Sequence, residues 1–294
     1  MSHKTDVVII GAGPVGLFAV FELGLLNLKC HLIDNLDKIG GQCSELYPEK
    51  PIYDIPAHPK ISGQELTDNL MLQIKPFEPA FHLNQQADSI IKSEDGWKIT
   101  TSQNVVILSK CIVIAAGAGS FVPRRPPLEN IEEFEKKSIF YAIRDKSKFK
   151  DKKILIAGGG DSALDWTNDL ASIADVTLMH RRKNFRAAPD SVSKMLELEN
   201  DNKIKFKLGQ LTQLIGEDGK LTKVKYKNED ILEEIEIDYL LPFFGLKMEL
   251  GPIANWGLNL NENLITVDTE KFETSTPTIF AIGDINTYPG KLKL

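Results

Sequence analysis

Cysteine is scarce in this sequence of 294 residues, where only Cys30, Cys43 and Cys111 occur. Three widely spaced cysteines without a Cys-x-x-Cys pair exclude a disulfide framework and a zinc-finger pattern. We therefore expect no metal site and a reducing compartment, the cytoplasm. Cys30 and Cys111 fall in apolar, strand-like segments, where buried thiols are inert.

Long uninterrupted hydrophobic runs are also lacking. The most apolar stretch, residues 7–28, is broken by glycines, a proline and Glu22, and little basic charge precedes it. A membrane helix needs about 20 consecutive apolar residues, and a signal peptide needs a basic start. We interpret the stretch as a buried strand followed by a helix, and expect no membrane association.

Positive charge is not in excess, since 35 Lys and Arg face 41 Asp and Glu, for a net charge of -6. This balance disfavours nucleic acid as a partner. With 42% hydrophobic and 26% charged residues, the composition is that of a soluble globular protein. The length fits two domains of ordinary size.

Strand-like and helix-like runs alternate twice along the chain. Residues 6–10 and 29–34 have the composition of buried strands, and residues 15–26 that of a helix between them. The same order recurs in residues 153–157, 162–172 and 175–180. The two sets lie 147 positions apart (Gly11 to Gly158). The pattern predicts an α/β protein with two Rossmann-like, doubly wound, three-layer domains.

Proline-rich stretches mark where the chain is expected to cross between these domains. Residues 121–127 leave the first domain, and residues 241–246 leave the second. The second domain, residues 119–242, is therefore predicted to be inserted into the first, residues 1–118 and 243–294.

Short strands are expected in the rest of both domains. Residues 83–118 and 204–242 are strand-like, with turns at residues 94–96 and 217–219. The apolar segment 277–284 is predicted to form a buried strand that ends in a glycine turn and rejoins the first sheet.

A glycine-rich motif follows the first predicted strand and opens the first helix; its members include Gly11, Gly13, Pro14, Val15 and Gly16. Gly11 permits the tight turn, Gly13 lets the backbone approach a pyrophosphate, and Gly16 allows the helix to pack on the strand. Asp34, 23 residues beyond Gly11, can accept the hydroxyls of an adenosine ribose. The alternative, an ordinary glycine turn, does not require this acid.

A second motif follows the strand at residues 153–157; its members are Gly158, Gly160, Asp161, Ser162 and Ala163. Here the next strand ends in basic residues instead of an acid: His180, Arg181, Arg182 and Arg186. Arginine matches a phosphate geometrically, whereas a carboxylate repels one, so this half favours NADP over NAD. The alternative is a solvated basic loop.

The two predicted sites differ in charge, and this difference indicates which cofactor each one binds. The acidic first site suits FAD or NAD, and the basic second site suits NADPH. FAD in the first site is the economical choice, because a reductase holds one redox group while the other exchanges.

Six blocks of the sequence together resemble the thioredoxin-reductase-like class, type 2, of ferredoxin–NADP reductases. They are GAGPVG, GGQCSELYPEKPIYDIPAHPKI, GGGDSALDW, HRRKNFRA, LGPIANWGL and FAIGDINTYPGKLKL. The blocks occur in the family's order and extend along nearly all of the chain. The resemblance implies a flavoprotein that transfers electrons between NADPH and ferredoxin or flavodoxin through FAD.

The resemblance also implies FAD contacts that spacing alone does not reveal, at Gly41, Gln42, Tyr47, Ala87, Phe121, Gly283 and Asp284. Tyr47 is expected to stack on the flavin, and Asp284 to bind its ribityl chain. No other catalytic residue is expected. Alternatives remain, because Tyr47 could be an interface tyrosine, Asp284 a turn residue and Ala87 a packed strand residue.

Thioredoxin reductases are nearly as similar but carry a Cys-x-x-Cys before the second glycine motif. Residues 139–153 contain no cysteine, so electrons cannot leave by thiol–disulfide exchange at that place. Two alternatives to ferredoxin reduction stay open. One is a reductase of a quinone or of a disulfide protein through Cys43, and the other is a flavin-binding sensor without turnover.

The family further implies a homodimer and a helix with a covering segment after the Gly-Asp motif. Only ten residues follow Asp284, so we expect a C-terminal truncation or completion by another chain. Basic residues gather at Arg124, Arg125, Lys136, Lys137, Lys146, Lys148, Lys150, Lys152 and Lys153. Such a face can steer an acidic acceptor, or can consist of ordinary solvated lysines.

Overall fold

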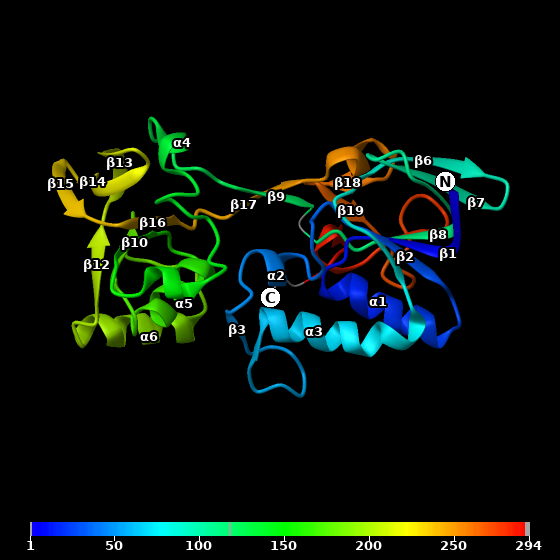
Figure 1. Ribbon diagram of the computed structural model, residues 1–294, viewed down its shortest axis with the longest axis horizontal. Coiled ribbons are helices and arrows are strands. Elements are labelled where there is room, and N and C mark those ends of the chain that lie inside the picture. The colour runs from blue at the N-terminus through cyan, green and yellow to red at the C-terminus, as the bar shows by residue number, and fades with distance from the viewer. Residues whose placement is uncertain (1, 118, 292–294) are drawn as a thin grey trace. The chain divides into compact units, whose positions relative to one another are not determined.

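The computed structural model describes residues 2–117 and 119–291, and it divides into two compact units (Figure 1). Unit 1 comprises Met1–Phe121 and Met248–Leu294, and unit 2 is Val122–Lys247. The chain passes between them along β9 (Ser120–Pro123) and β17 (Leu246–Glu249), which pair with each other. Among the described residues, no helix combines the length and apolar character needed to cross a membrane.

Unit 1 is built on a seven-stranded sheet. Its strands are β1 (Ser2–Ile10), β2 (Cys30–Ile33), β5 (Ala80–His82), β6 (Ala87–Ser93), β7 (Gly96–Thr101), β8 (Val106–Ile114) and β20 (Ile279–Ala281). The parallel part has the order β5-β2-β1-β8, and β20 pairs with the end of β8. β7 and β6 extend it in antiparallel fashion. The predicted return of residues 277–284 to the first sheet is confirmed.

The helices of unit 1 are α1 (Pro14–Leu25), α2 (Gln42–Glu45) and α3 (Gly63–Ile74), with 3-10 turns η1 (Lys75–Phe77), η3 (Gly251–Asn255) and η4 (Gly283–Ile285). Shorter strands are β3 (Pro51–Ile52), β4 (Ile61–Ser62), β18 (Leu260–Asn261), β19 (Leu264–Thr266) and β21 (Asn286–Thr287). α1 starts with Pro14, whose missing N–H is not needed there. α3 starts with a reciprocal capping box between Ser62 and Glu65.

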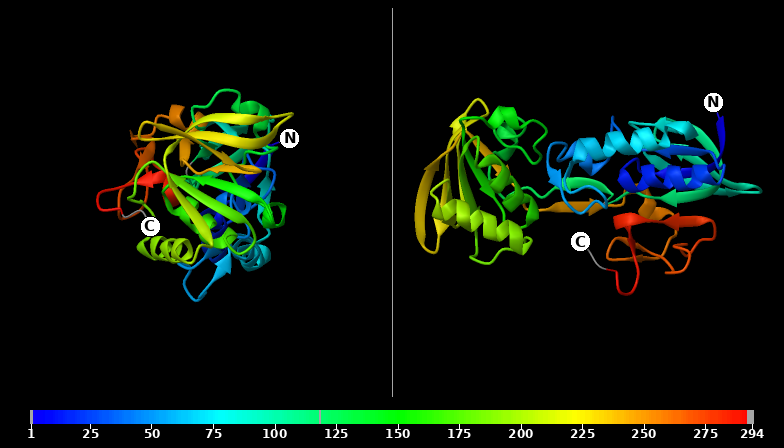
Figure 2. Two further views of the ribbon diagram at one scale, coloured as in Figure 1. Left: turned by 90° about the vertical axis from the view of Figure 1, so that its left-hand side faces the viewer. Right: turned by 90° about the horizontal axis from the view of Figure 1, so that it is seen from below.

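The two faces of the sheet have separate cores because side chains alternate along each strand. Val7 and Ile9 of β1 pack with α1 and α3, whereas Val8 and Ile10 pack with the C-terminal segment that contains β19 and β20. Figure 2 shows α1 and α3 on one side of the sheet and the orange-to-red segment on the other. The parallel strands β1, β2 and β8 thus have buried residues on both faces, as their apolar sequence predicts.

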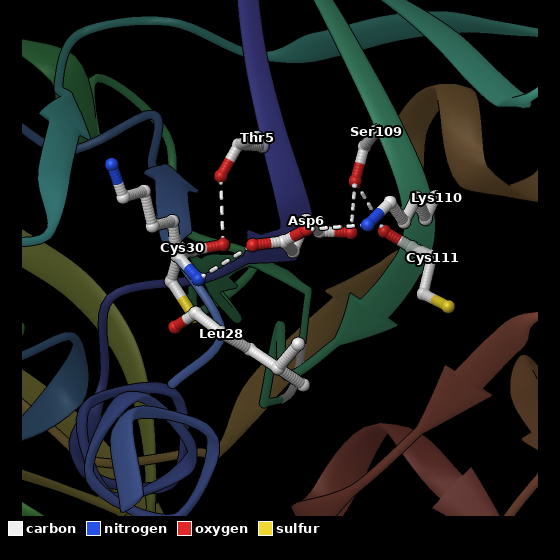
Figure 3. Close-up of polar contacts among 8 residues, drawn as sticks. Thr5, Asp6, Leu28, Cys30, Ser109, Lys110 and Cys111 are labelled. Atoms are coloured by element: carbon white, nitrogen blue, oxygen red, sulfur yellow. Dashed lines mark hydrogen bonds and ion pairs between the residues drawn. The ribbon is translucent and has the colours of Figure 1, made fainter. Parts of the chain in front are cut away.

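Asp6 fastens the first strand to its two neighbours (Figure 3). Its carboxylate accepts the Lys29 backbone N–H at 3.0 Å and pairs with the Lys110 ammonium at 2.8 Å. The Ser109 hydroxyl donates to the Asp6 carbonyl, and the Thr5 hydroxyl donates to the Lys29 carbonyl. These bonds fix the register of β1 against β2 and β8. The carboxyl ends of the three strands therefore lie side by side.

Three histidine rings from β1, β2 and β5 pack against one another. The ring centroids of His3, His31 and His82 are 5.2 to 5.5 Å apart, and Nδ1 of His31 lies 3.0 Å from Nε2 of His82. Burial, followed by the charges of His82 and His3, lowers the pKa of His31 to about 4. Burial, followed by the charge of His3, also lowers the pKa of His82.

This cluster makes folding stability depend on pH. Because both folded-state pKa values lie below the ordinary value, the unfolded chain binds more protons than the folded one below about pH 6.5. Stability is therefore complete above that pH and is lost as the pH falls toward 4. After discounting for partial exposure, we expect His31→Gln to remove about 1 kcal/mol of the loss between pH 7 and pH 5.

Urea denaturation of the wild type and the variant at both pH values measures this difference. His58→Gln is the matched control, because His58 is exposed in a loop outside the cluster. If H31Q and the wild type lose the same stability on acidification, the cluster does not control it.

Unit 2 contains a four-stranded parallel sheet of order β12-β11-β10-β16. Its strands are β10 (Lys153–Ala157), β11 (Asp175–His180), β12 (Ile204–Leu208) and β16 (Tyr239–Pro242). A separate antiparallel sheet consists of β13 (Gln210–Glu217), β14 (Lys220–Asn228) and β15 (Ile231–Glu236). The helical elements are α4 (Ile131–Phe134), η2 (Lys146–Phe149), α5 (Asp161–Leu170) and α6 (Pro189–Asn200).

Predicted and observed elements of unit 2 agree closely. The strands expected at residues 153–157 and 175–180 are β10 and β11. The helix expected to reach residue 172 ends at Leu170, because the N–H groups of Ile173 and Ala174 both turn back to the Leu170 carbonyl. The predicted fold class, two Rossmann-like units with one inserted into the other, is confirmed.

Candidate functional site

A cleft in unit 1 opens at the carboxyl ends of β1, β2 and β8. In a sheet of this order, β1 and β8 flank the point where strand order reverses, which is where Rossmann-like sheets bind ligands. Eleven of the predicted FAD residues line the cleft: Gly11, Gly13, Pro14, Val15, Asp34, Gly41, Gln42, Tyr47, Ala87, Gly283 and Asp284. Residues predicted from separate parts of the sequence therefore come together in one place.

The glycines of the first motif have different structural roles. Gly11 has φ +106°, and a Cβ there would overlap the Ala115 carbonyl oxygen. A Cβ on Gly16 would overlap the Gly11 carbonyl oxygen, so Gly16 lies beneath the cleft and lets α1 pack on β1. Gly13 has open space, with only the Cα of Gly41 at 3.8 Å. Gly13 thus leaves room for a ligand at the N-terminus of α1.

The N-terminus of α1 suits an anion. Its N-cap residue, Gly13, has no side chain to accept the first amide N–H groups. Unpaired amides and the helix dipole attract a phosphate at such an end.

Asp34, at the end of β2, is held in place by backbone groups. Its Oδ2 accepts the Ala12 N–H at 2.6 Å, and its Oδ1 accepts the Leu36 N–H at 2.9 Å. Burial raises the pKa of Asp34, although these hydrogen bonds oppose the effect. Each carboxylate oxygen retains a lone pair, so the oriented carboxylate can still accept ribose hydroxyls.

The segment after Asp34 folds over the first motif. The Gly40 N–H donates to the Ala12 carbonyl at 2.9 Å, and Gly40 and Gly41 both have positive φ. A Cβ on Gly41 would lie 3.0 Å from the Cα of Gly13. Glycine is therefore favoured at Gly41, both by its positive φ and by this close approach.

Tyr47 and Cys43 both line the cleft, and each affects the pKa of the other. Burial, reinforced by Cys43, raises the pKa of the Tyr47 hydroxyl well above its usual range. Burial also raises the pKa of the Cys43 thiol, and it raises that of Cys30 to about 11 and that of Cys111. All three thiols are thus held protonated, which disfavours nucleophilic exchange.

The remaining predicted FAD residues come from distant segments. Ala87 is buried at the start of β6, while Asp284 is exposed in η4. Gly283 has φ +78°, and a Cβ there would approach the Val15 side chain to 3.2 Å. The side chain of Phe121 lies outside the part of the chain that the structure describes.

Several lining residues were missed by the sequence reasoning: Leu36, Cys43, Gln85, Gln86, Ala115, Ala116, Gly117, Leu250, Pro252, Ile253 and Ile282. Gln85 is positioned by its N–H, which donates to the Asp34 carbonyl, and by its side-chain oxygen, which accepts from Thr101. Gly117 could have been predicted from the sequence, because the apolar run of β8 is followed by a turn that contains glycine, as is the apolar run of β1. For the glutamines there was no signal.

In unit 2, the second glycine motif has the same strand-turn-helix form. A Cβ on Gly158 would lie 2.6 Å from the Phe243 carbonyl oxygen and 2.9 Å from the Ala163 Cβ, so close packing requires glycine. Gly160 is the N-cap of α5 and has nothing within 4 Å of its would-be Cβ. Asp161 and Ser162 are exposed in the first turn of the helix, whereas Ala163 is buried.

The predicted basic residues follow β11 and lie beside this turn. The Arg186 N–H donates to the Gly159 carbonyl at 2.7 Å, and a Cβ on Gly159 would lie 2.5 Å from the His180 ring. Arg181, Arg182 and Arg186 are exposed. Burial and these arginines lower the pKa of His180. The positive charge at this turn therefore comes from the arginines at neutral pH.

Within the described residues, no group of three or more His, Cys, Asp or Glu side chains has a geometry that could hold a metal ion.

Two nested Rossmann-like units, each with a glycine-rich turn at a helix N-terminus, define a protein that binds two dinucleotides. A family model described as pyridine nucleotide-disulphide oxidoreductase matches residues 5–293, and the chain belongs to this family.

Curated relatives are longer than this chain. A protein named ferredoxin–NADP reductase from Parvibaculum lavamentivorans is 61% identical over 293 residues, which cover 99% of this chain and 85% of the relative. One of the same name from Nitrobacter winogradskyi is 60% identical, covering 99% of this chain and 86% of the relative.

Solved structures of thioredoxin reductases share the fold. The enzyme from T. acidophilum superposes with a TM-score of 0.85 at 24% identity, covering 97% of this chain and 91% of its own. The enzyme from Lactococcus lactis superposes with a TM-score of 0.84 at 26% identity, covering 98% and 93%.

Proposed function

We propose that this protein is a ferredoxin–NADP reductase that uses FAD to transfer electrons between NADPH and ferredoxin. The observation that carries the proposal is the pair of glycine-rich turns with opposite charge. One faces the buried carboxylate of Asp34, and the other lies beside a loop with three arginines. The curated relatives named ferredoxin–NADP reductase support the same activity.

FAD is assigned to the cleft of unit 1. The uncapped N-terminus of α1 would hold the pyrophosphate, and the Asp34 carboxylate would hold the adenosine ribose. Tyr47 and Asp284, which both line the cleft, are assigned to the flavin and its ribityl chain, and Gly283 leaves room for the backbone to approach. When bound, FAD supplies the conversion between a two-electron nicotinamide and a one-electron carrier.

NADPH is assigned to unit 2. Gly158 and Gly160 form the turn, the N-terminus of α5 faces the pyrophosphate, and Arg181 and Arg182 bind the 2′-phosphate. Arg186 and His180 border the same site. No carboxylate of the kind that Asp34 provides in unit 1 ends β11, so a phosphate is not repelled there.

The electron acceptor is assigned from the residues that line the FAD cleft. The only cysteine lining the cleft among the described residues is Cys43, and burial keeps its thiol protonated. A disulfide acceptor is therefore disfavoured relative to a one-electron carrier, either ferredoxin or flavodoxin. A quinone acceptor and a sensor without turnover remain as outcomes of the experiment below.

The basic residues between 124 and 153 give their surface less net positive charge than the sequence suggests. Arg125 pairs with Glu135 at 2.7 Å, Lys146 with Asp169 at 2.7 Å, and Lys153 with Glu236 at 2.8 Å. These carboxylates neutralise three of the nine cations that were expected to steer an acidic acceptor. The alternative, an ordinary solvated surface, is favoured for this region.

A homodimer and a cytoplasmic location complete the proposal. Apolar side chains on the outer surface of α1 and α3 support self-association, because Phe18, Leu25, Leu26 and Leu72 are 46 to 69% exposed. Exposed apolar side chains on neighbouring helices are typical of protein interfaces. Sedimentation velocity measures the oligomeric state directly. Three thiols without a disulfide support a reducing compartment.

The purified protein is expected to be yellow and to release FAD, not FMN, on denaturation, because the cleft provides a site for an adenosine ribose. NADPH is expected to bleach the bound flavin under anaerobic conditions, and ferredoxin or flavodoxin to restore its colour. The measurements are chromatography of the released cofactor and stopped-flow absorbance with a panel of acceptors.

A colourless protein that FAD does not reconstitute would contradict the cofactor assignment. A flavin that NADPH reduces, but that only a quinone or a disulfide reoxidises, would contradict the acceptor. A flavin that NADPH does not reduce would identify a sensor instead of an enzyme.

A further inference from the structure

Asp161, the first residue of α5, contacts the arginine loop. We define this loop as residues 181–188, between β11 and α6. The Oδ1 atom of Asp161 accepts the backbone N–H of Ala188 at 2.7 Å. Ala188 is the N-cap residue of α6, so the carboxylate holds the point at which the loop ends.

A second bond ties the loop to the same glycine-rich turn. The Arg186 N–H donates to the Gly159 carbonyl at 2.7 Å. Immediately before Arg186, the Phe185 ring stacks on His180 with centroids 5.6 Å apart and packs against Phe206 at 5.5 Å. The backbone that carries the arginines is therefore held to the α5 N-terminus and its glycine-rich turn by two hydrogen bonds, and to β11 and β12 by two aromatic contacts.

The arginine side chains themselves are not fixed by ion pairs. Arg181, Arg182 and Arg186 are exposed, and in the described part of the chain none has a carboxylate partner within 4 Å. Long, free side chains bind a phosphate well only if their Cα atoms start from the right place. The placement of the loop backbone thus determines how well a phosphate is bound.

Direct binding of the cofactor by Asp161 is a poor explanation of this geometry. A carboxylate in the first turn of a helix that receives a pyrophosphate adds negative charge where an anion binds. Its observed partner is instead a backbone N–H 27 residues further along the chain. The sequence expectation that Asp161 contacts NADP is not supported by this bond.

We propose that Asp161 is a positioning residue that holds the arginine loop in place for the 2′-phosphate and so sets the preference for NADPH over NADH. The inference rests on the proposed function and deepens it. Asp161 acts through Ala188 on the loop and does not act on the reacting atoms.

The test compares Asp161→Ala with Asp161→Asn in the FAD-containing protein. Alanine removes the acceptor, whereas asparagine loses the charge but keeps an oxygen that can accept the Ala188 N–H. Because a hydrogen bond to a charged group in an exposed site is only partly realised, we expect D161A to weaken 2′-phosphate binding about five- to tenfold. D161N is expected to stay within about twofold of the wild type.

The probes are 2′,5′-ADP and 5′-AMP, which differ only in the 2′-phosphate, and calorimetry measures their dissociation constants. D161A should weaken 2′,5′-ADP and leave 5′-AMP unchanged. Hydrogen exchange at the Ala188 amide should accelerate in D161A and stay slow in D161N. Asp190→Ala is the matched control, because it removes a carboxylate two residues beyond Ala188 that pairs with Lys194 one turn along its own helix.

Two failures are distinguishable. If the wild type binds 2′,5′-ADP no better than 5′-AMP, the assignment of NADPH to unit 2 is wrong. Asp161 does not position the loop if the wild type prefers 2′,5′-ADP over 5′-AMP and D161A shows the same preference. The same conclusion follows if D161A and D161N both weaken the binding of 2′,5′-ADP and of 5′-AMP by the same factor. An equal loss in D190A would show that the effect is not specific to the bond between Asp161 and Ala188.

Discussion

Replacing Arg181 and Arg182 together by alanine is expected to raise the Michaelis constant for NADPH by one to two orders of magnitude, with little change for NADH. Hydrogen bonds to charged groups contribute about 1.5 to 3 kcal/mol, and a factor of ten corresponds to about 1.4 kcal/mol. Two exposed guanidinium groups beside the second glycine turn account for the expected range. The turnover number should change little, since the 2′-phosphate is remote from the reacting carbon.

Steady-state kinetics with both nucleotides measures the effect. Lys183→Ala is the matched control, because Lys183 is an exposed cation on the same loop that the arginine pattern does not include. Its Michaelis constants should remain within about threefold of the wild type. An equal loss for NADPH and NADH in the double variant would show that these arginines do not distinguish the 2′-phosphate.

Replacing Gly11 by alanine is expected to lower the free energy of unfolding by about 3 to 5 kcal/mol and to yield protein without FAD. Two effects act together at this position. The backbone has φ +106°, which L-residues rarely adopt, and the added Cβ would overlap the Ala115 carbonyl oxygen. That carbonyl belongs to the turn after β8 and has no room to move, because the Ala115 N–H is bonded to the Ile10 carbonyl.

Gly13→Ala separates packing from binding in the same motif. Gly13 has φ -75°, and its would-be Cβ meets only the Gly41 Cα at 3.8 Å, so stability should change by less than about 1 kcal/mol. Its methyl group would nevertheless occupy the cleft, so FAD content should fall. Urea denaturation and the ratio of flavin to protein absorbance measure both outcomes. Equal stability of G11A and the wild type would exclude the overlap as a constraint.

Local spacing in the sequence accounts for the parts of this site that lie within one βαβ unit. Gly11, Gly13 and Asp34 belong to one βαβ unit, where the spacing of a strand, a turn and a second strand determines what lies together. The same holds for Gly158, Gly160 and the arginines in unit 2. Tyr47 and Asp284 were found only through a family resemblance, because no local rule brings them to the cleft.

What the sequence did not predict depends on contacts between distant segments. Gln85 lies in the cleft because its backbone bonds to Asp34 and its side chain bonds to Thr101, and no motif marks it. The bond between the Asp161 carboxylate and the Ala188 N–H joins residues 27 positions apart, and no motif predicts it. The basic run was expected either to steer an acidic acceptor or to be an ordinary solvated surface, and the carboxylate partners of three of its members come from other elements.

The strand order of unit 1 also governs when this protein can become functional during its synthesis. β8 ends at Ile114, and its neighbour β20 begins at Ile279, 165 positions later. At ribosomal rates of about 5 to 20 residues per second, the end of β8 lacks this neighbour for roughly 10 to 30 seconds. Unit 2 is contiguous and can fold in that interval. Gly283 and Asp284 then arrive with β20, so the nascent chain acquires a complete flavin cleft only after the nucleotide-binding insert has already been made.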